Sequence, residues 1–268
     1  MLDDQRIGRV LIIAGSDSGG GAGIQADIKT VTALGGYAAT AITALTVQNT
    51  LGVTGVYPAP LDVIERQARA VLEDIGADVL KTGMLGASEV VELVAQLLDD
   101  AGVPAVIDPV MIAKGGQPLL EDRAVATVRT HMIRRAALLT PNAPEAEALT
   151  GLTVEDLDGQ RRAGEALLKL GAAAVLMKGG HVPGETVVDL LVTAEGETTF
   201  DGPRIDTRHT HGTGCTLASA CATGLAQGLP LAEAVARAWA YTAEAVRRAP
   251  GFGRGHGPLD HAWPMRDR

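Results

Sequence analysis

Short apolar runs alternate along the chain with longer stretches in which apolar and polar positions mix at helical spacing. Residues 10–13 form one such run, which predicts a buried strand, and residues 24–34 after it predict a helix. Further buried strands are predicted at residues 105–107, 138–139 and 173–177. Because buried strands that alternate with helices form mainly parallel sheets covered on both faces, we expect an α/β fold.

The rest of the pattern adds edge strands and two long helices. A few edge strands are expected within residues 36–60, and residues 187–192 predict one strand of a hairpin. The two helices are expected near residues 214–227 and 231–248. No internal repeat or linker interrupts the chain, so residues 1–268 predict a single domain.

The composition excludes several classes of protein. Hydrophobic residues make up 46% and charged residues 21% of the chain, which excludes a disordered protein, and aromatic residues make up only 3%, so the core must be aliphatic. The net charge is −9, so the chain as a whole has no attraction to nucleic acid or to anionic membranes. A local site for a small anion is still compatible with this charge.

The sequence also gives an expectation for location. No segment has the roughly 18 consecutive apolar residues of a membrane span, and the first residues carry two acids and no apolar core of a signal peptide. The two cysteines, Cys215 and Cys221, fall in one predicted helix and form no disulfide framework. We therefore expect a cytoplasmic protein, with no membrane partner and no fused second domain.

The segment around Cys215 is the strongest candidate for chemistry. Gly212, Thr213 and Gly214 open a predicted helix, where free backbone N–H groups and the helix dipole form an anion hole. Cys215 lies in the first turn, where a thiolate is stabilised, so its pKa is expected to be lowered. The alternative is a small buried cysteine behind an ordinary glycine turn.

Polar residues follow several other predicted strands. Asp108, Glu145 and Asn142 are candidates for a magnesium-linked phosphate site, and Lys178 offers a positive charge for a phosphate. Each has a simpler explanation as a turn, helix-capping or solvated residue, and their shared position at one sheet edge favours function. Gln48 has the donors and acceptor that complement an aminopyrimidine, although its spacing alone favours a side chain that satisfies its own loop backbone.

The glycine-rich segment 15–23 has neither the dinucleotide-binding nor the P-loop spacing. Its glycines allow a flat ligand to approach the backbone closely, and Asp27 in the next helix faces either that pocket or solvent. The histidines are not spaced as zinc ligands, His209 and His211 being only two positions apart.

Seven ordered motifs together resemble a known family. They are residues 14–27, 47–50, 81–85, 108–111, 140–145, 178–181 and 210–216, within a similarity that extends from about residue 8 to residue 261. The chain resembles the hydroxymethylpyrimidine/phosphomethylpyrimidine kinases of thiamine biosynthesis, a branch of the ribokinase-like superfamily. The resemblance implies a ribokinase-like three-layer sandwich, a homodimer, and two successive Mg²⁺-dependent phosphoryl transfers from ATP, first to 4-amino-5-hydroxymethyl-2-methylpyrimidine and then to its monophosphate.

The resemblance also implies roles for individual residues. Gln48 would bind the aminopyrimidine, in a pocket lined by Gly15, Ala22, Asp27 and Met84. Cys215 would be the catalytic base, at the anion hole of Gly212, Thr213 and Gly214. Asp108 and Glu145 would hold Mg²⁺, while Lys178, Asn142 and Thr210 would contact the phosphates of ATP.

Three other functions remain open at this point. Pyridoxal kinases of the same branch share the cysteine-type anion hole and act on a similar flat hydroxymethyl ring. A cysteine hydrolase would pair Cys215 with His209 or His211. A regulator would bind the nucleotide and turn nothing over.

Overall fold

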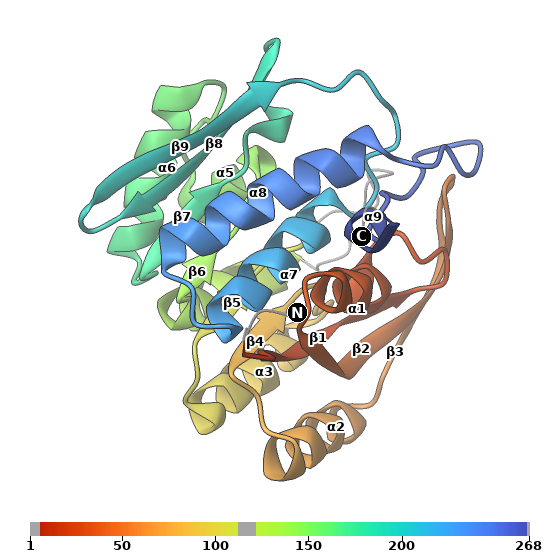
Figure 1. Ribbon diagram of the computed structural model, residues 1–268. Coiled ribbons are helices and arrows are strands. Elements are labelled where there is room, and N and C mark those ends of the chain that lie inside the picture. Colours follow the sequence, from red (N-terminus) through yellow and green to blue (C-terminus); the bar gives the residue numbers. More distant parts are fainter. Residues whose placement is uncertain (1–5, 112–121, 267–268) are drawn as a thin grey trace.

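A single sheet forms the centre of the computed structural model, which describes residues 6–111 and 122–266 (Figure 1). Its strands are β1 (Arg9–Asp17), β2 (Tyr37–Asn49), β3 (Gly52–Pro58), β4 (Val79–Thr82), β5 (Ala105–Ile107), β6 (Leu138–Leu139), β7 (Ala174–Met177), β8 (Thr186–Thr193) and β9 (Gly196–Pro203). They form one nine-stranded sheet in the order β3-β2-β1-β4-β5-β6-β7-β8-β9. One sheet therefore contains the first and the last strand of the described chain.

The middle of the sheet is parallel and its two ends are antiparallel. Neighbouring strands run parallel from β2 through β1, β4, β5 and β6 to β7. The β2–β3 hairpin and the β7–β8 and β8–β9 pairs are antiparallel. The predicted α/β class with a mainly parallel sheet is confirmed. The edge assignment within residues 36–60 is correct only for β3, because β2 lies inside the sheet between β1 and β3.

Helices cover both faces of this sheet. They are α1 (Gly23–Ala33), α2 (Leu61–Asp74), α3 (Ser88–Ala101), α4 (Asp122–Thr127), α5 (Ala143–Thr150), α6 (Leu157–Lys169), α7 (Thr213–Ala226), α8 (Leu231–Arg247) and α9 (Trp263–Arg266). Figure 1 shows α1, α7 and α8 side by side across one face, which gives the three-layer arrangement. Within the described residues, no helix has the length and apolar character needed to cross a bilayer.

Alternation along β1 explains the two hydrophobic cores. Leu11 and Ile13 point to the face covered by α2, α3 and α6, whereas Val10 and Ile12 point to the face covered by α1, α7 and α8. All four side chains are almost fully buried. A strand buried on both faces needs apolar residues at successive positions, which is the pattern found in residues 10–13.

Local sequence signals fix the helix starts nearest the site. Asn142 caps α5: its side chain accepts from the N–H of Glu145 (2.9 Å), and the Glu145 carboxylate accepts from the N–H of Asn142 (2.8 Å). This reciprocal capping box confirms the predicted helix start at Asn142. The α7 helix begins after Gly212, whose φ of +86° lies in the left-handed region.

Candidate active site

The glycine-rich loop after β1 and the loop before α7 touch each other at the carboxyl edge of the sheet. A Cβ on Gly212 would lie 1.8 Å from the carbonyl oxygen of Gly21, so no larger residue fits there without moving the backbone. Thr213 Oγ1 donates to the carbonyl of Thr210 (2.8 Å), which closes the turn. The N–H of Thr213 also donates to that carbonyl (3.4 Å). The other N–H groups of a first helical turn have no partner within the helix, so this turn presents them to the site.

A cation lies next to this helix start. Lys178 Nζ follows β7 and is 2.8 Å from Asp108 Oδ1 and 3.7 Å from Glu145 Oε2. A Cβ on Gly214 would lie 3.2 Å from Lys178 Nζ and 3.5 Å from Asp108 Oδ2. The structure therefore brings Lys178, Asp108, Glu145 and the α7 turn together, from segments as much as 106 positions apart (214 − 108).

Burial controls the charge of this cluster. Burial raises the pKa of Glu145 to about 7, although Lys178 lowers it, and the neighbouring Asp108 raises it further. The pKa of Lys178 is raised above its ordinary value, because Asp108 and Glu145 outweigh the effect of burial. Lys178 is therefore a cation at neutral pH, and Glu145 changes charge near neutrality.

The same two carboxylates have the chemistry of a magnesium site. Mg²⁺ in proteins needs one or two carboxylates and completes its shell with waters and phosphates. Asp108 and Glu145 are 2% and 6% exposed, and Asp108 Oδ2 points toward the α7 turn. Among the described residues, no group of three or more His, Cys, Asp and Glu side chains is placed to hold a metal.

The pKa of the Cys215 thiol is raised, whereas the sequence predicts that it is lowered. Burial raises the pKa of the Cys215 thiol to about 12, and although Lys81 and a hydrogen bond from the Gly23 backbone lower it, Asp27 and Asp108 raise it. The predicted lowering of its pKa is therefore wrong. The helix start does favour a thiolate, but two nearby carboxylates and the loss of water act more strongly.

A fully buried ion pair lies beside Cys215. Lys81 Nζ is 2.9 and 3.0 Å from the two carboxylate oxygens of Asp27, and both side chains are 0% exposed. Ser219, one turn after Cys215 in α7, donates to Asp27 Oδ1 (2.7 Å). Asp27 thus faces neither solvent nor an open pocket in this structure, and its assignment to the substrate pocket remains a prediction.

The other predicted pocket residues lie near the glycine-rich loop. A Cβ on Gly15 would lie 2.4 Å from the Met84 methyl carbon, so the two residues are in direct contact. Ala22 precedes α1 and donates its N–H to Asp17 Oδ2 (2.8 Å). Gln48 lies near the end of β2, where the register with β3 shifts, and its half-buried amide contacts Thr46 and His211.

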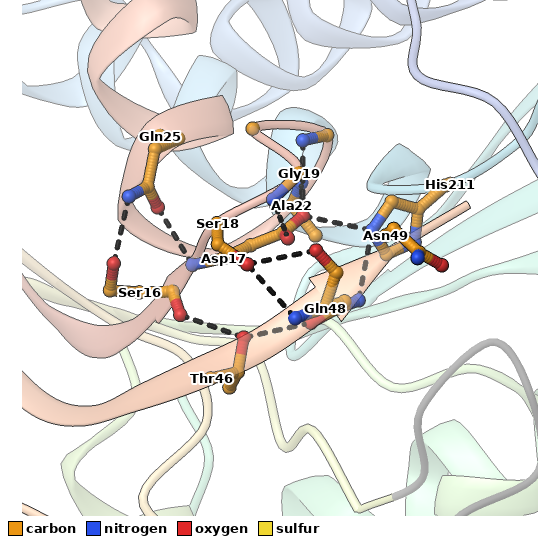
Figure 2. A network of polar contacts seen from close by, with 12 residues as sticks. Ser16, Asp17, Ser18, Gly19, Ala22, Gln25, Thr46, Gln48, Asn49 and His211 are labelled. Carbon is orange, nitrogen blue, oxygen red and sulfur yellow. Dashed lines mark hydrogen bonds and ion pairs between the residues drawn. The ribbon is translucent and has the colours of Figure 1, made fainter. Parts of the chain in front are cut away.

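Figure 2 shows two further side chains in this region, Asp17 and His211. His211 Nε2 is 2.9 Å from Asp17 Oδ2, so it is directed at that carboxylate rather than at Cys215. His209 Nδ1 is buried and has no hydrogen-bond partner among the described residues. This geometry does not support the cysteine-hydrolase alternative.

The sequence assigns no role to Asp17, Lys81 or Ser219, although the first two lie within the family motifs, and it suggests His211 only as a partner of Cys215. One available signal is the spacing after Asp17, because Gly19, Gly21 and Ala22 donate their N–H groups to its carboxylate. A short acidic residue followed by small residues is typical of such a turn. The other three residues are brought to the site by the tertiary fold.

A family model described as phosphomethylpyrimidine kinase matches residues 17–260. The chain belongs to this family. The hydroxymethylpyrimidine/phosphomethylpyrimidine kinase of Streptomyces coelicolor is 48% identical, over 96% of this chain and 95% of that protein. The thiamine biosynthesis bifunctional protein ThiED of Geobacter sulfurreducens is 50% identical over 97% of this chain, which spans 54% of that longer relative.

Solved structures agree with this assignment. The ADP complex of Bacillus subtilis pyridoxal kinase has a TM-score of 0.91 and 33% identity, covering 98% of this chain and 100% of that one. The phosphomethylpyrimidine kinase of Clostridium difficile has a TM-score of 0.80 and 41% identity, covering 89% of this chain and 99% of that one. The predicted ribokinase-like fold is confirmed by these likenesses.

Proposed function

We propose that this family member is a phosphotransferase that uses ATP to phosphorylate 4-amino-5-hydroxymethyl-2-methylpyrimidine, and then its monophosphate, in thiamine biosynthesis. The observation that carries the proposal is the position of Lys178, Asp108 and Glu145 against the first turn of α7. It combines a cation, two carboxylates and free N–H groups at one point. Phosphoryl transfer needs that combination, because it depends mainly on alignment and charge neutralisation.

In the first transfer the substrate hydroxyl oxygen attacks the γ-phosphorus, the bond between that phosphorus and the bridging oxygen of ADP breaks, and the hydroxyl proton is released to water. Lys178, held by Asp108, neutralises charge on the phosphates, and Asn142 and Thr210 lie in the neighbouring turns. The N–H groups of Gly212 and Gly214 stabilise the transferring group, and the N–H of Thr213 joins them when it leaves the Thr210 carbonyl, to which it donates at 3.4 Å in the structure. In the second transfer an oxygen of the monophosphate is the nucleophile, so the same donors serve both steps.

Magnesium, when bound with ATP, would supply further positive charge to the phosphates. Asp108 and Glu145 would hold it through their carboxylate oxygens, completed by water and phosphate. A bound cation would favour the ionised form of Glu145, in the same direction as Lys178, which lowers the pKa of that carboxyl.

Cys215 assists the transfer rather than driving it. With a pKa of about 12 it is a neutral thiol at physiological pH, so it does not remove the hydroxyl proton before the transfer begins. A neutral thiol has a hydrogen to donate but cannot take up a proton, so Cys215 orients the nucleophile by hydrogen bonding and the hydroxyl proton is released to water. Most of the rate enhancement then comes from Lys178 and the α7 turn.

The pyrimidine would bind between the glycine-rich loop and β2. Gln48 would present its amide to the aminopyrimidine, and Gly15 and Met84, which contact each other, would line the pocket. Ala22 lies next to the turn before α7, so we expect the hydroxymethyl group to lie near Cys215.

The product mass after incubation with Mg-ATP tests the proposal. Two successive additions of about 80 Da to the hydroxymethylpyrimidine are expected, the mass of one PO₃H group each. Pyridoxal is the second candidate substrate, since the likeness to pyridoxal kinase structures extends over nearly the whole chain. Phosphorylation of pyridoxal alone would overturn the pyrimidine assignment, and no product from either would overturn kinase activity.

The proposal includes a homodimer and a cytoplasmic location. The β2–β3 hairpin exposes Leu45 (56%), Val47 (51%) and Tyr57 (64%) on one face, since Leu45 pairs with Tyr57, and Val56 (45%) on the other. A second copy would cover this surface, and light scattering would give the mass of two chains. The continuous sheet supports treating residues 1–268 as one domain, and the two free cysteines suit a reducing compartment.

A further inference from the structure

Asp17 is the centre of a hydrogen-bond network that joins three loops (Figure 2). Its Oδ1 accepts from the N–H of Gly19 (2.7 Å), and its Oδ2 accepts from Gly21 (3.0 Å) and Ala22 (2.8 Å). Burial raises the pKa of Asp17, but the hydrogen bonds from His211 and the backbone outweigh it and hold the pKa below its ordinary value. Asp17 is therefore a carboxylate, which can only accept hydrogen bonds.

The charge of Asp17 determines where His211 carries a hydrogen. His211 Nε2 is 2.9 Å from Asp17 Oδ2, and an ionised carboxylate has no proton to give. Nε2 must then be the donor, whether the ring is neutral or cationic. The backbone N–H of His211 donates to the carbonyl of Gly257 (3.2 Å), and this second contact holds the residue in place.

In the structure the Gln48 amide nitrogen lies 3.1 Å from the same Nε2, and the Gln48 amide oxygen lies 3.2 Å from Thr46 Oγ1. Thr46 Oγ1 gives its single hydrogen to the carbonyl of Ser16 (2.9 Å), so toward Gln48 it can only accept. With the amide nitrogen toward His211, two donors would face each other at one end and two acceptors at the other. With the amide oxygen toward His211, the single Nε2 hydrogen is shared between Asp17 Oδ2 and Gln48 Oε1, and the Gln48 amide nitrogen donates to Thr46 Oγ1, so every donor faces an acceptor.

We propose that Asp17 and His211 are positioning residues that lock the Gln48 amide with Oε1 toward His211 and Nε2 toward Thr46. An amide has two donor hydrogens and two acceptor lone pairs, and these contacts use one of each. One hydrogen and one lone pair remain for a ligand.

The unused hydrogen and lone pair of the Gln48 amide determine which ring the site prefers. This step of the inference rests on the proposed function. A 4-aminopyrimidine carries a ring nitrogen acceptor directly beside an amino donor, which complements a fixed amide. Pyridoxal has no such adjacent pair. The Asp17–His211 pair therefore contributes to the choice of the aminopyrimidine, without touching the ring itself.

Two substitutions of His211 separate this role from a general loss of structure. His211→Asn is too short to place a donor at the Nε2 position, whereas His211→Gln places an amide nitrogen there. We expect His211→Asn to raise the KM and the calorimetric Kd for the hydroxymethylpyrimidine about tenfold, the effect of one lost hydrogen bond. We expect His211→Gln to stay within about threefold of the wild type, with the KM for ATP within about twofold in both.

A matched control and a double variant complete the test. His209→Asn makes the same change two positions away, outside the network, and should leave the pyrimidine Kd within about twofold. Because His211 acts through Gln48, adding His211→Asn to Gln48→Ala should weaken pyrimidine binding no further. The proposal would be overturned if the double variant raised the pyrimidine Kd by the product of the two single effects. It would also be overturned if His211→Asn and His211→Gln raised that Kd equally.

A measurement without substrate keeps the two proposals apart. In a long-range ¹H–¹⁵N NMR spectrum of the free protein, the His211 ring should carry its hydrogen on Nε2. A bare Nε2 would overturn the amide orientation even if the pyrimidine is phosphorylated. If the wild type binds no pyrimidine, the proposed function fails, and the NMR result alone decides on the network.

Discussion

Removing Lys81 should destabilise the protein strongly, because it would leave the Asp27 carboxylate buried without its cation. Both side chains are 0% exposed, and the only other hydrogen bond to Asp27 described here comes from Ser219. Breaking a fully buried ion pair from one side costs about 3–5 kcal/mol, against a typical total stability of about 5–15 kcal/mol. For Lys81→Met we therefore expect a fall in Tm of roughly 6–20 °C.

The loss should depend on pH in a predictable direction. Burial raises the pKa of Asp27 even with Lys81 beside it, and without Lys81 this increase must be larger. A carboxyl with a raised folded pKa adds stability below its unfolded pKa of about 3.9, and this stability is lost as pH rises through the folded value. The deficit of Lys81→Met should therefore be largest at neutral pH and shrink toward pH 4.

Denaturant unfolding at several pH values measures both effects. The double variant Lys81→Met/Asp27→Asn should recover most of the lost stability, since it contains no buried charge and Asn still accepts from Ser219. Arg69→Met is the control, because it breaks an exposed ion pair with Glu65 and Asp100 and should change little. A Lys81→Met variant as stable as the control, or a double variant less stable than the single one, would refute the reasoning.

Three other changes have clear expected outcomes. Cys215→Ala should lower kcat about tenfold and leave the KM for ATP within about twofold in steady-state assays, and an unchanged kcat would exclude Cys215 from the transfer. Gln48→Ala should raise the KM for the pyrimidine about tenfold, and a rise confined to ATP would contradict its role. Burial raises the pKa of Asp189 to about 6, so its neutral form is the one that favours folding. Asp189→Asn should therefore raise Tm at pH 8, with the gain shrinking as pH falls below 6, and an equal gain at pH 4 would point to another cause.

Most of the elements near the site can be predicted from local sequence. The apolar residues of β1 and β7, the capping box at Asn142 and the glycines before α7 are all signals within a few residues of the structure they predict. The helix α3 has a similar signal that the sequence analysis leaves unassigned, since Val90, Val94 and Leu97 recur at helical spacing and are buried.

The electrostatics of the site cannot be predicted in this way. The pKa of Cys215 depends on Asp27 and Asp108, which approach it only in the folded protein, and the helix start alone predicts a shift in the opposite direction. The orientation of the Gln48 amide depends on His211. Gln48 also lies at a shift in the register between β2 and β3, and no local sequence pattern indicates that shift. A lysine in a short strand such as β4 gives no sign that it will be fully buried.

The close approach of Gly212 to Gly21 has a consequence for how the protein becomes active. It joins a loop near the start of the chain to one near its end, and the contacts beside it do the same: Asp17 and His211 are 194 positions apart, and Asp27 and Ser219 are 192 apart. Contacts of such long range form late, because the intervening chain must fold first. On the ribosome, the first strand and helix therefore wait for most of the chain to be synthesised before the site they belong to exists. A chain interrupted before residue 211 would have most of its sheet but would lack the α7 turn. The sheet should therefore fold before the protein gains activity.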